Sequence, residues 1–227
     1  MSQLILEFDS QTTTPKYPDF NDFLGDSNRE LIHILQHQQE RFIYVWGATG
    51  VGKSHLLKAW VAQALEQGEA AAYVDASKEP LGDHLRENRF LAVDAVEALS
   101  GHEQVTLFSI FNQFRDLSGG HLLISGDVAP AFLNIREDLR TRMGYCLVYE
   151  VKALTDLEKI NSLREMAKAR QLVIGDELFR YLLTHWRRDM DSLMQIVEAL
   201  DHYSMALHKP ITLPLLKKLL NQEHTET

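Results

Sequence analysis

Short apolar runs alternate with amphipathic stretches along the first two thirds of the chain. The runs are rich in β-branched and aromatic residues, which is typical of buried strands, whereas the stretches between them carry apolar residues at helical spacing. Strands that alternate with helices predict a parallel sheet with helices on both faces. We therefore expect an α/β fold with a five-stranded parallel sheet flanked by helices, of which the helix at 77–86 has the weakest pattern. The expected strands are 42–46, 70–74, 90–94, 121–127 and 145–151.

The last third of the chain changes character and shows only helical patterns. Thr155 and Glu158 have the spacing of a capping box that opens a helix. Asp176 and Asp189 are placed to cap two further helices, and Pro210 separates a last amphipathic helix from these. We expect a flexible leader at 1–16, an α/β domain at 17–152 and an all-helical domain at 153–227.

One glycine-rich segment joins the first expected strand to the helix after it. Residues 47–54, Gly-Ala-Thr-Gly-Val-Gly-Lys-Ser, match the P-loop pattern G-x-x-x-x-G-K-[ST] at every fixed position. Glycines allow successive N–H groups to point at phosphate oxygens, and the helix N-terminus adds positive charge. The match of both flanks favours this interpretation over a turn with an incidental lysine. The expected phosphate-binding residues are Gly47, Thr49, Gly50, Val51, Gly52, Lys53 and Ser54.

Two aspartates end later strands at the edge of the sheet where the P-loop is also expected. Asp94 closes strand 90–94 and Asp127 closes strand 121–127. In parallel sheets, ligands bind at the carboxyl ends of the strands. We expect Ser54 and Asp94 to hold Mg²⁺, with Asp94 acting through water. Asp127 either contacts the γ-phosphate or a water, or caps the turn that follows it.

Ala95 follows Asp94 at a position where motor-type P-loop ATPases carry a second acid that orients the attacking water. Glu97 lies two residues further on, and its spacing alone gives no reason to assume that it takes the role of that acid. Without a positioned base, we expect weak or no intrinsic ATP hydrolysis.

The chain carries 23 Lys and Arg residues against 32 Asp and Glu residues, a formal net charge of −9. This balance argues against tight, direct binding of duplex DNA. The single cysteine, Cys146, lies in an apolar run, which predicts a buried thiol and excludes a disulfide within the chain. With no signal-peptide pattern and no apolar run near the ~20 residues of a membrane span, we expect a cytoplasmic protein without a membrane partner.

Two further segments allow more than one interpretation. Residues 1–8 form either an edge strand packed on the domain or a peptide displayed for the pocket of a partner. Its anchors would be Gln3, Leu4, Leu6 and Phe8. Arg140 and Arg142 lie in a short charged helix, and spacing alone indicates only surface pairing with Glu137 and Asp138.

The order of these features resembles the DnaA/Hda family of AAA+ modules, and the resemblance covers essentially the whole chain. It is carried by Phe20-Asn21-Asp22-Phe23 with Gly25, by 47–57, by Ser125-Gly126-Asp127 before Pro130, and by Asp138–Met143. It implies an AAA+ nucleotide-binding base domain at 17–152 and a helical lid at 153–227. It also implies bound ADP or ATP with Mg²⁺, and adds His55 and Asp127 to the nucleotide-binding residues.

The resemblance further implies a regulator of bacterial replication initiation. Gln3, Leu4, Leu6 and Phe8 would then bind the β sliding clamp of DNA polymerase III, so that DNA is reached only through the clamp. Arg142 would act as an arginine finger in the ATP site of the initiator DnaA, with Arg140 as an accessory. The resemblance also allows self-association.

Departures from the family pattern refine this expectation. DnaA continues into a helix-turn-helix domain, whereas this chain ends at Thr227, so we expect a regulator and not the initiator. At the position of the family's sensor-2 arginine this chain has Asp191, which would repel a γ-phosphate and favour a diphosphate. Arg187 and Arg188 are candidates to replace that arginine.

Two alternative functions remain. One is an autonomous AAA+ ATPase, such as a helicase-loader-like remodelling factor, and the other is a non-enzymatic adaptor between clamp and initiator.

Overall fold

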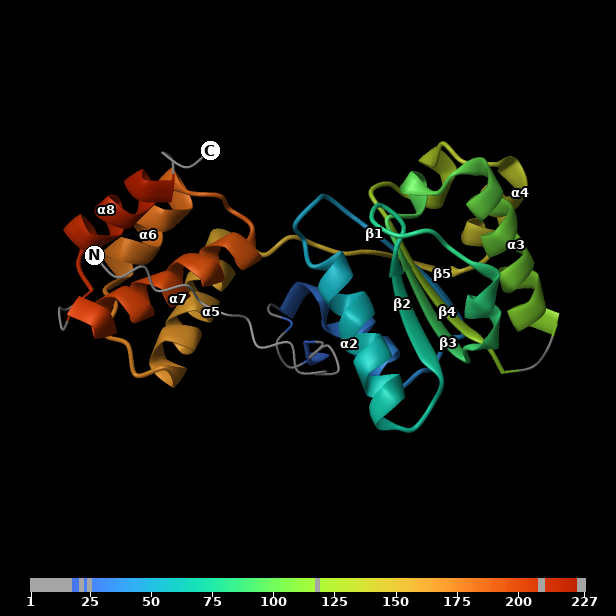
Figure 1. The fold of residues 1–227 in the computed structure, drawn as a ribbon, viewed down its shortest axis with the longest axis horizontal. Helices are drawn as coiled ribbons and strands as arrows, with labels where there is room; N and C mark the ends of the chain where they lie inside the picture. The colour runs from blue at the N-terminus through green and yellow to red at the C-terminus, as the bar shows by residue number, and fades with distance from the viewer. Residues whose placement is uncertain (1–17, 21–22, 24–25, 117–118, 208–210, 224–227) are drawn as a thin grey trace, which may run out of the picture.

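The computed structural model describes residues 18–20, 23, 26–116, 119–207 and 211–223. The expected clamp-binding residues Gln3, Leu4, Leu6 and Phe8 lie outside this part of the chain. Figure 1 shows an α/β part and an all-helical part joined by a single connection. The predicted boundary between residues 152 and 153 falls in that connection, between β5 and α5.

The elements follow the predicted alternation. The α/β part contains η2 (Asp26–Asn28), α1 (Arg29–Gln36), β1 (Phe42–Trp46), α2 (Lys53–Glu66), β2 (Ala71–Asp75), η3 (Asp83–Glu87), β3 (Phe90–Asp94), η4 (Val96–Ala98), α3 (Gly101–Asp116), β4 (His121–Gly126), η5 (Pro130–Phe132), α4 (Glu137–Gly144) and β5 (Leu147–Glu150). The helical part contains α5 (Asp156–Ala169), α6 (Asp176–His185), α7 (Met190–Leu207) and α8 (Leu213–Glu223).

All five strands are parallel, in the order β2-β3-β4-β1-β5, which confirms the predicted sheet. The register pairs Asp75 with Asp94 and Trp46 with Gly126. The carboxyl ends of β1 to β4 therefore meet at one edge, next to the P-loop that follows β1. This arrangement brings residues from four separate segments to one place.

Helices cover both faces of the sheet. On β1, the side chains of Ile43 and Val45 pack in the cluster that includes α1 and α2, whereas Tyr44 packs in the cluster of α3 and α4. Alternate strand residues point to opposite faces, so a strand covered on both faces must be apolar throughout. This explains why the strands appear in the sequence as continuous apolar runs.

The helical part has an apolar core of its own, with Leu163, Phe179 and Leu193 among its buried residues. As predicted, Thr155 and Glu158 form a capping box at the start of α5. Asp189 also caps α7 as predicted, because its Oδ1 accepts a hydrogen bond of 2.8 Å from the Ser192 amide.

Two local predictions were wrong. Gly175, and not Asp176, is the N-cap of α6; Asp176 is the first helical residue, and its carboxylate accepts hydrogen bonds of 3.0 Å from the Arg164 guanidinium. The helix expected at 77–86 is replaced by a turn and the short η3, because Pro80 and Gly82 interrupt helical propagation. Within the described residues, none of the helices has the length and apolar character needed to cross a membrane.

Candidate nucleotide-binding site

A cavity of about 630 Å³ lies at the carboxyl edge of the sheet, between the P-loop and the start of α7. Its volume is within the usual range for small-ligand sites. The wall contains most of the predicted site residues: Thr49, Gly50, Val51, Gly52, Lys53, Ser54, His55, Asp94 and Asp127. Gly47 does not line the cavity, but its carbonyl oxygen contacts the Lys53 ammonium.

The P-loop glycines are required by backbone geometry and by close packing. Gly50 and Gly52 have φ of 81° and 99°, in the left-handed region that favours glycine. A Cβ on Gly52 would lie 2.6 Å from the Phe23 ring, and one on Gly50 would lie 3.1 Å from Cβ of Asp189. The loop ends at the first turn of α2, where free backbone N–H groups favour an anion.

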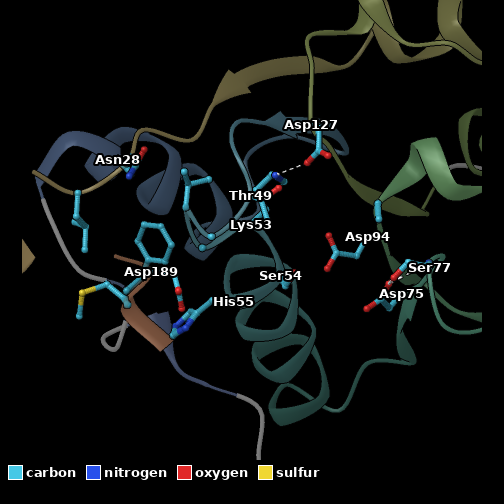
Figure 2. Close-up of a pocket in the computed structure, with 18 of the residues that line it drawn as sticks. Asn28, Thr49, Lys53, Ser54, His55, Asp75, Ser77, Asp94, Asp127 and Asp189 are labelled. Carbon is cyan, nitrogen blue, oxygen red and sulfur yellow. Dashed lines mark hydrogen bonds and ion pairs between the residues drawn. The ribbon is translucent and has the colours of Figure 1, made fainter. Parts of the chain in front are cut away.

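Lys53 is held at the cavity wall by backbone and side-chain oxygens. Its Nζ donates to the carbonyl oxygens of Gly47 (2.5 Å) and Ala48 (3.2 Å) and lies 3.0 Å from Asp127 Oδ1. Figure 2 shows the ammonium and the Asp127 carboxylate facing each other across the top of the P-loop. The Asp127 carboxylate therefore lies close enough to interact electrostatically with a phosphate bound to Lys53.

Asp94 is almost fully buried, and both of its carboxylate oxygens accept hydrogen bonds. The Ser125 hydroxyl donates to Oδ1, and the Tyr73 hydroxyl donates to Oδ2 at 2.8 Å. Tyr73 also shares a hydrogen bond with Ser54, and burial together with Asp94 raises the pKa of the Tyr73 hydroxyl well above its usual range. Tyr73 thus remains a donor and connects the two expected metal ligands.

The donor atoms at this position fit Mg²⁺, which prefers oxygen ligands and keeps several waters. Ser54 and Asp94 supply such oxygens. Among the described residues, no group of three or more His, Cys, Asp or Glu side chains is arranged to hold a metal ion by itself. The residues therefore suit an ion that phosphates and water also coordinate; when bound, Mg²⁺ would neutralise phosphate charge.

The cavity also has apolar lining that the sequence reasoning did not assign to the site. It comes from the segment before α1, the connection to the lid, and α7. The residues are Phe23, Ala153, Leu154, Met190 and Met194, and they lie beside Val51 of the predicted P-loop. Of these residues, only Phe23 belongs to a motif that the sequence analysis identified, the one that begins at Phe20. Such a surface suits the flat apolar faces of a nucleobase.

Asn28 lies on the same side of the P-loop as Asp189, opposite Asp94 and Asp75 (Figure 2). Its amide Nδ2 donates to the Lys152 carbonyl oxygen, and its Oδ1 accepts from the Lys152 N–H, both at 2.9 Å. The Asn28 side chain is therefore committed to the backbone that leads into the lid.

The lid also brings a basic residue to the cavity wall. The Arg188 guanidinium donates to both carboxylate oxygens of Asp156, at 2.5 and 2.6 Å. Lys159 of α5 lines the cavity, whereas neither Arg187 nor Arg188 is among the described residues of its wall. The side chain of Asp191 lies outside the described part of the structure.

Arg142 lies on α4, away from the cavity wall. Its guanidinium carbon is 5.4 Å from the ring centroid of Phe108 and 6.0 Å from that of Phe111, both on α3. These distances are those of cation–π contacts. Arg140 is on the same helix, also outside the wall.

The strand order, and the helical lid that meets the P-loop, place this chain in the AAA+ class of nucleotide-binding folds. Domain III of DnaA from Thermotoga maritima superposes with a TM-score of 0.75 at 21% identity, over 93% of this chain and 98% of that one. AMPPCP-bound DnaA from Aquifex aeolicus gives a TM-score of 0.71 at 22% identity, over 95% and 71% of the two chains. At these identities the likeness shows the fold alone.

Sequence comparison identifies the family. The model described as "Hda, lid domain" matches residues 156–220. An uncharacterized protein from Haemophilus influenzae is 31% identical over 211 residues, which cover 88% of this chain and 91% of that relative. This chain belongs to the DnaA/Hda family.

Proposed function

We propose that this chain is a nucleotide-bound regulator of replication initiation that stimulates ATP hydrolysis by the initiator DnaA. Arg142 enters the DnaA site in trans and stabilises the charge that develops on the γ-phosphate, which converts DnaA to its inactive ADP form. Arginine fingers supplied in trans raise rates by ~10³–10⁵ in other systems. We place this action in the bacterial cytoplasm.

The observation that carries the proposal is the position of Arg142 outside its own cavity. The contacts with Phe108 and Phe111 hold the guanidinium on the surface of the α3–α4 pair, away from the chain's own Lys53 and Asp94. A residue so placed has no role in the local site, but it is available to a second molecule. Aromatic support restricts the long side chain and lowers the entropy lost on docking.

The surface beside α4 supports a protein partner. Phe132 in η5, which packs against α4, is 78% exposed, and Tyr145 at the end of α4 is 73% exposed. Exposed aromatic side chains close to an arginine are typical of interaction hot spots. We propose that this partner is the AAA+ module of DnaA.

We infer that the cavity holds ADP or ATP with Mg²⁺, as the AMPPCP-bound DnaA structure illustrates for a protein of this fold. The diphosphate is expected to be favoured, because Asp127 and Glu97 add negative charge beside Lys53, where a γ-phosphate would lie. Bound nucleotide would then hold the lid and the α/β part in the geometry that presents Arg142.

We further propose that Gln3, Leu4, Leu6 and Phe8 bind the β sliding clamp, so that DNA is contacted only through the clamp. Tethering would raise the local concentration of the regulator near newly replicated DNA. A variant with Leu4 and Phe8 changed to Ala should lose the stimulation that depends on the clamp while it keeps nucleotide binding.

The direct test is ATP hydrolysis by purified DnaA with the clamp loaded on DNA, with and without this chain. Arg142→Ala should abolish stimulation while clamp and nucleotide binding persist. Arg140→Ala is the matched control, because it removes the same charge from the same helix and should retain most stimulation. Full stimulation by Arg142→Ala would exclude the finger role and leave the adaptor between clamp and initiator as the better account.

A second candidate function is an autonomous ATPase, such as a helicase-loader-like remodelling factor. The observation that favours it is Glu97 on the cavity wall, close to the expected phosphate position. A reaction with this chain alone separates the two. Rapid multiple turnover without DnaA would make the autonomous ATPase the leading function.

A further inference from the structure

Glu97 lies on the wall of the nucleotide cavity, although the position directly after Asp94 holds Ala95. The methyl group of Ala95 also lines the cavity but offers no acid or hydrogen-bond acceptor. Glu97 is therefore the carboxylate from this segment that faces the expected phosphates without being buried in the Asp94 hydrogen-bond network.

The backbone after Asp94 explains how Glu97 reaches this position. Ala95 adopts left-handed dihedral angles (φ 56°, ψ 55°), which are rare for a residue with a Cβ. The chain thus leaves the direction of β3 at once and enters η4, which carries Glu97. The Ala95 N–H donates to Ser125 Oγ at 3.0 Å, and Val96 is fully buried. Strained backbone held from two sides is a recurrent feature of functional sites.

The carboxylate of Glu97 lies over the end of β4. Its Oε2 is 3.2 Å from the point that a Cβ on Gly126 would occupy. The backbone N–H of Asp127 donates to the Glu97 carboxylate, and Lys53 attracts it electrostatically. Lost hydration, followed by the charge of Asp127, raises the pKa of Glu97 above its usual range. Glu97, Asp127 and Lys53 thus converge at the γ-phosphate end of the cavity.

We propose that Glu97 orients and deprotonates the attacking water in a slow ATP hydrolysis carried out by this chain's own site. The water oxygen bonds to the γ-phosphorus while the bond from that phosphorus to the β,γ-bridging oxygen breaks. ADP leaves with the electron pair of that bond, and the water proton passes to Glu97 and then to solvent. The products are ADP and inorganic phosphate.

This activity goes beyond the proposed regulation of DnaA and does not depend on it. It would allow the chain to produce its own diphosphate form after binding ATP. The reaction is expected to be slow, because the Glu97 carboxylate already accepts a hydrogen bond from the Asp127 amide, which competes with the attacking water.

The test is single-turnover hydrolysis of γ-labelled ATP by excess full-length chain with Mg²⁺. Glu97→Gln should slow conversion by about 10²-fold, the usual contribution of a general base. Glu87→Gln is the matched control: Glu87 is an exposed glutamate of η3 that does not line this cavity, and its rate should equal that of wild type. Lys53→Ala, which should not hold ATP, measures any contaminating ATPase.

Binding of AMPPCP is measured in parallel, and Glu97→Gln should bind it as wild type does. Three results would overturn the proposal: a wild-type rate equal to that of Lys53→Ala, a Glu97→Gln rate equal to wild type, or a loss of AMPPCP affinity that accounts for the slower rate. Glu97→Gln loaded directly with ADP should still stimulate DnaA, so failure here is distinguishable from failure of the Arg142 proposal.

Discussion

Asn28 and Lys152 are 124 positions apart, yet the side-chain amide of Asn28 makes both hydrogen bonds to the backbone of Lys152. The pairing connects the start of α1 to the segment that leads from β5 into the lid. Because Asn28 is only 4% exposed, water cannot readily replace it. The contact therefore holds the segment between β5 and α5, which leads into the lid, against the α/β part beside the nucleotide cavity.

Replacing Asn28 by Ala should lower the free energy of unfolding of the chain by about 1–3 kcal/mol, because two backbone groups lose their partners at a buried position. Chemical denaturation monitored by circular dichroism measures this loss. Asn134→Ala, at an exposed asparagine, should change stability by less than about 0.5 kcal/mol. Equal effects of the two substitutions would show that the Asn28 pairing contributes little.

Gly52→Ala should abolish nucleotide binding with only a modest loss of stability. A methyl group at this position meets the Phe23 ring at 2.6 Å, and φ of 99° disfavours any Cβ. Gly101→Ala is the control, since a Cβ there meets nothing within 4 Å. Titration with a fluorescent ADP analogue reports the difference, and unimpaired binding by Gly52→Ala would mean that the loop rearranges freely.

Tyr73→Phe should weaken the part of nucleotide affinity that depends on Mg²⁺. The substitution removes the hydroxyl that donates to Asp94 and is bonded to Ser54, so the two expected ligands are no longer held together. Affinity measured in EDTA should stay near the wild-type value. Tyr149→Phe removes a hydroxyl that donates to Glu30, and we expect it to leave both affinities unchanged.

Asp127→Asn should raise the affinity for ATP relative to ADP. The substitution removes the negative charge that lies 3.0 Å from Lys53, so a γ-phosphate meets less repulsion and a less neutralised lysine. Asp83→Asn removes an equal charge from an exposed ion pair with Arg86 and controls for net charge. An unchanged ratio of the two affinities would place the γ-phosphate away from Asp127.

Cys146 should react very slowly with iodoacetamide in the folded chain at pH 8. Burial raises the pKa of this thiol to about 12, so the reactive thiolate is scarce and also poorly accessible. Unfolding restores an ordinary thiol pKa, and labelling in denaturant should be fast. Mass spectrometry of labelled protein over time distinguishes the two rates, and rapid native labelling would contradict the burial of Cys146.

The sequence by itself determined the features that depend on neighbouring residues. The strands follow from apolar runs, which are continuous in β1, β3 and β4 because those central strands are buried on both faces. The P-loop is a local backbone pattern, and so is the capping box of Thr155 and Glu158. Two local patterns led to wrong predictions. The Asp176 carboxylate pairs with Arg164 and does not cap α6, and Pro80 prevents the helix expected at 77–86.

The tertiary structure alone decided which distant residues complete the site. Tyr73 meets Asp94 because β2 and β3 are paired, and Phe23, Asn28 and Met194 reach the cavity from segments with no spacing relation to the P-loop. The backbone turn at Ala95, which carries Glu97 to the phosphate end, leaves no trace in a pattern of residue types. Packing between remote segments sets these positions, and a linear pattern contains no information about which remote segments come together.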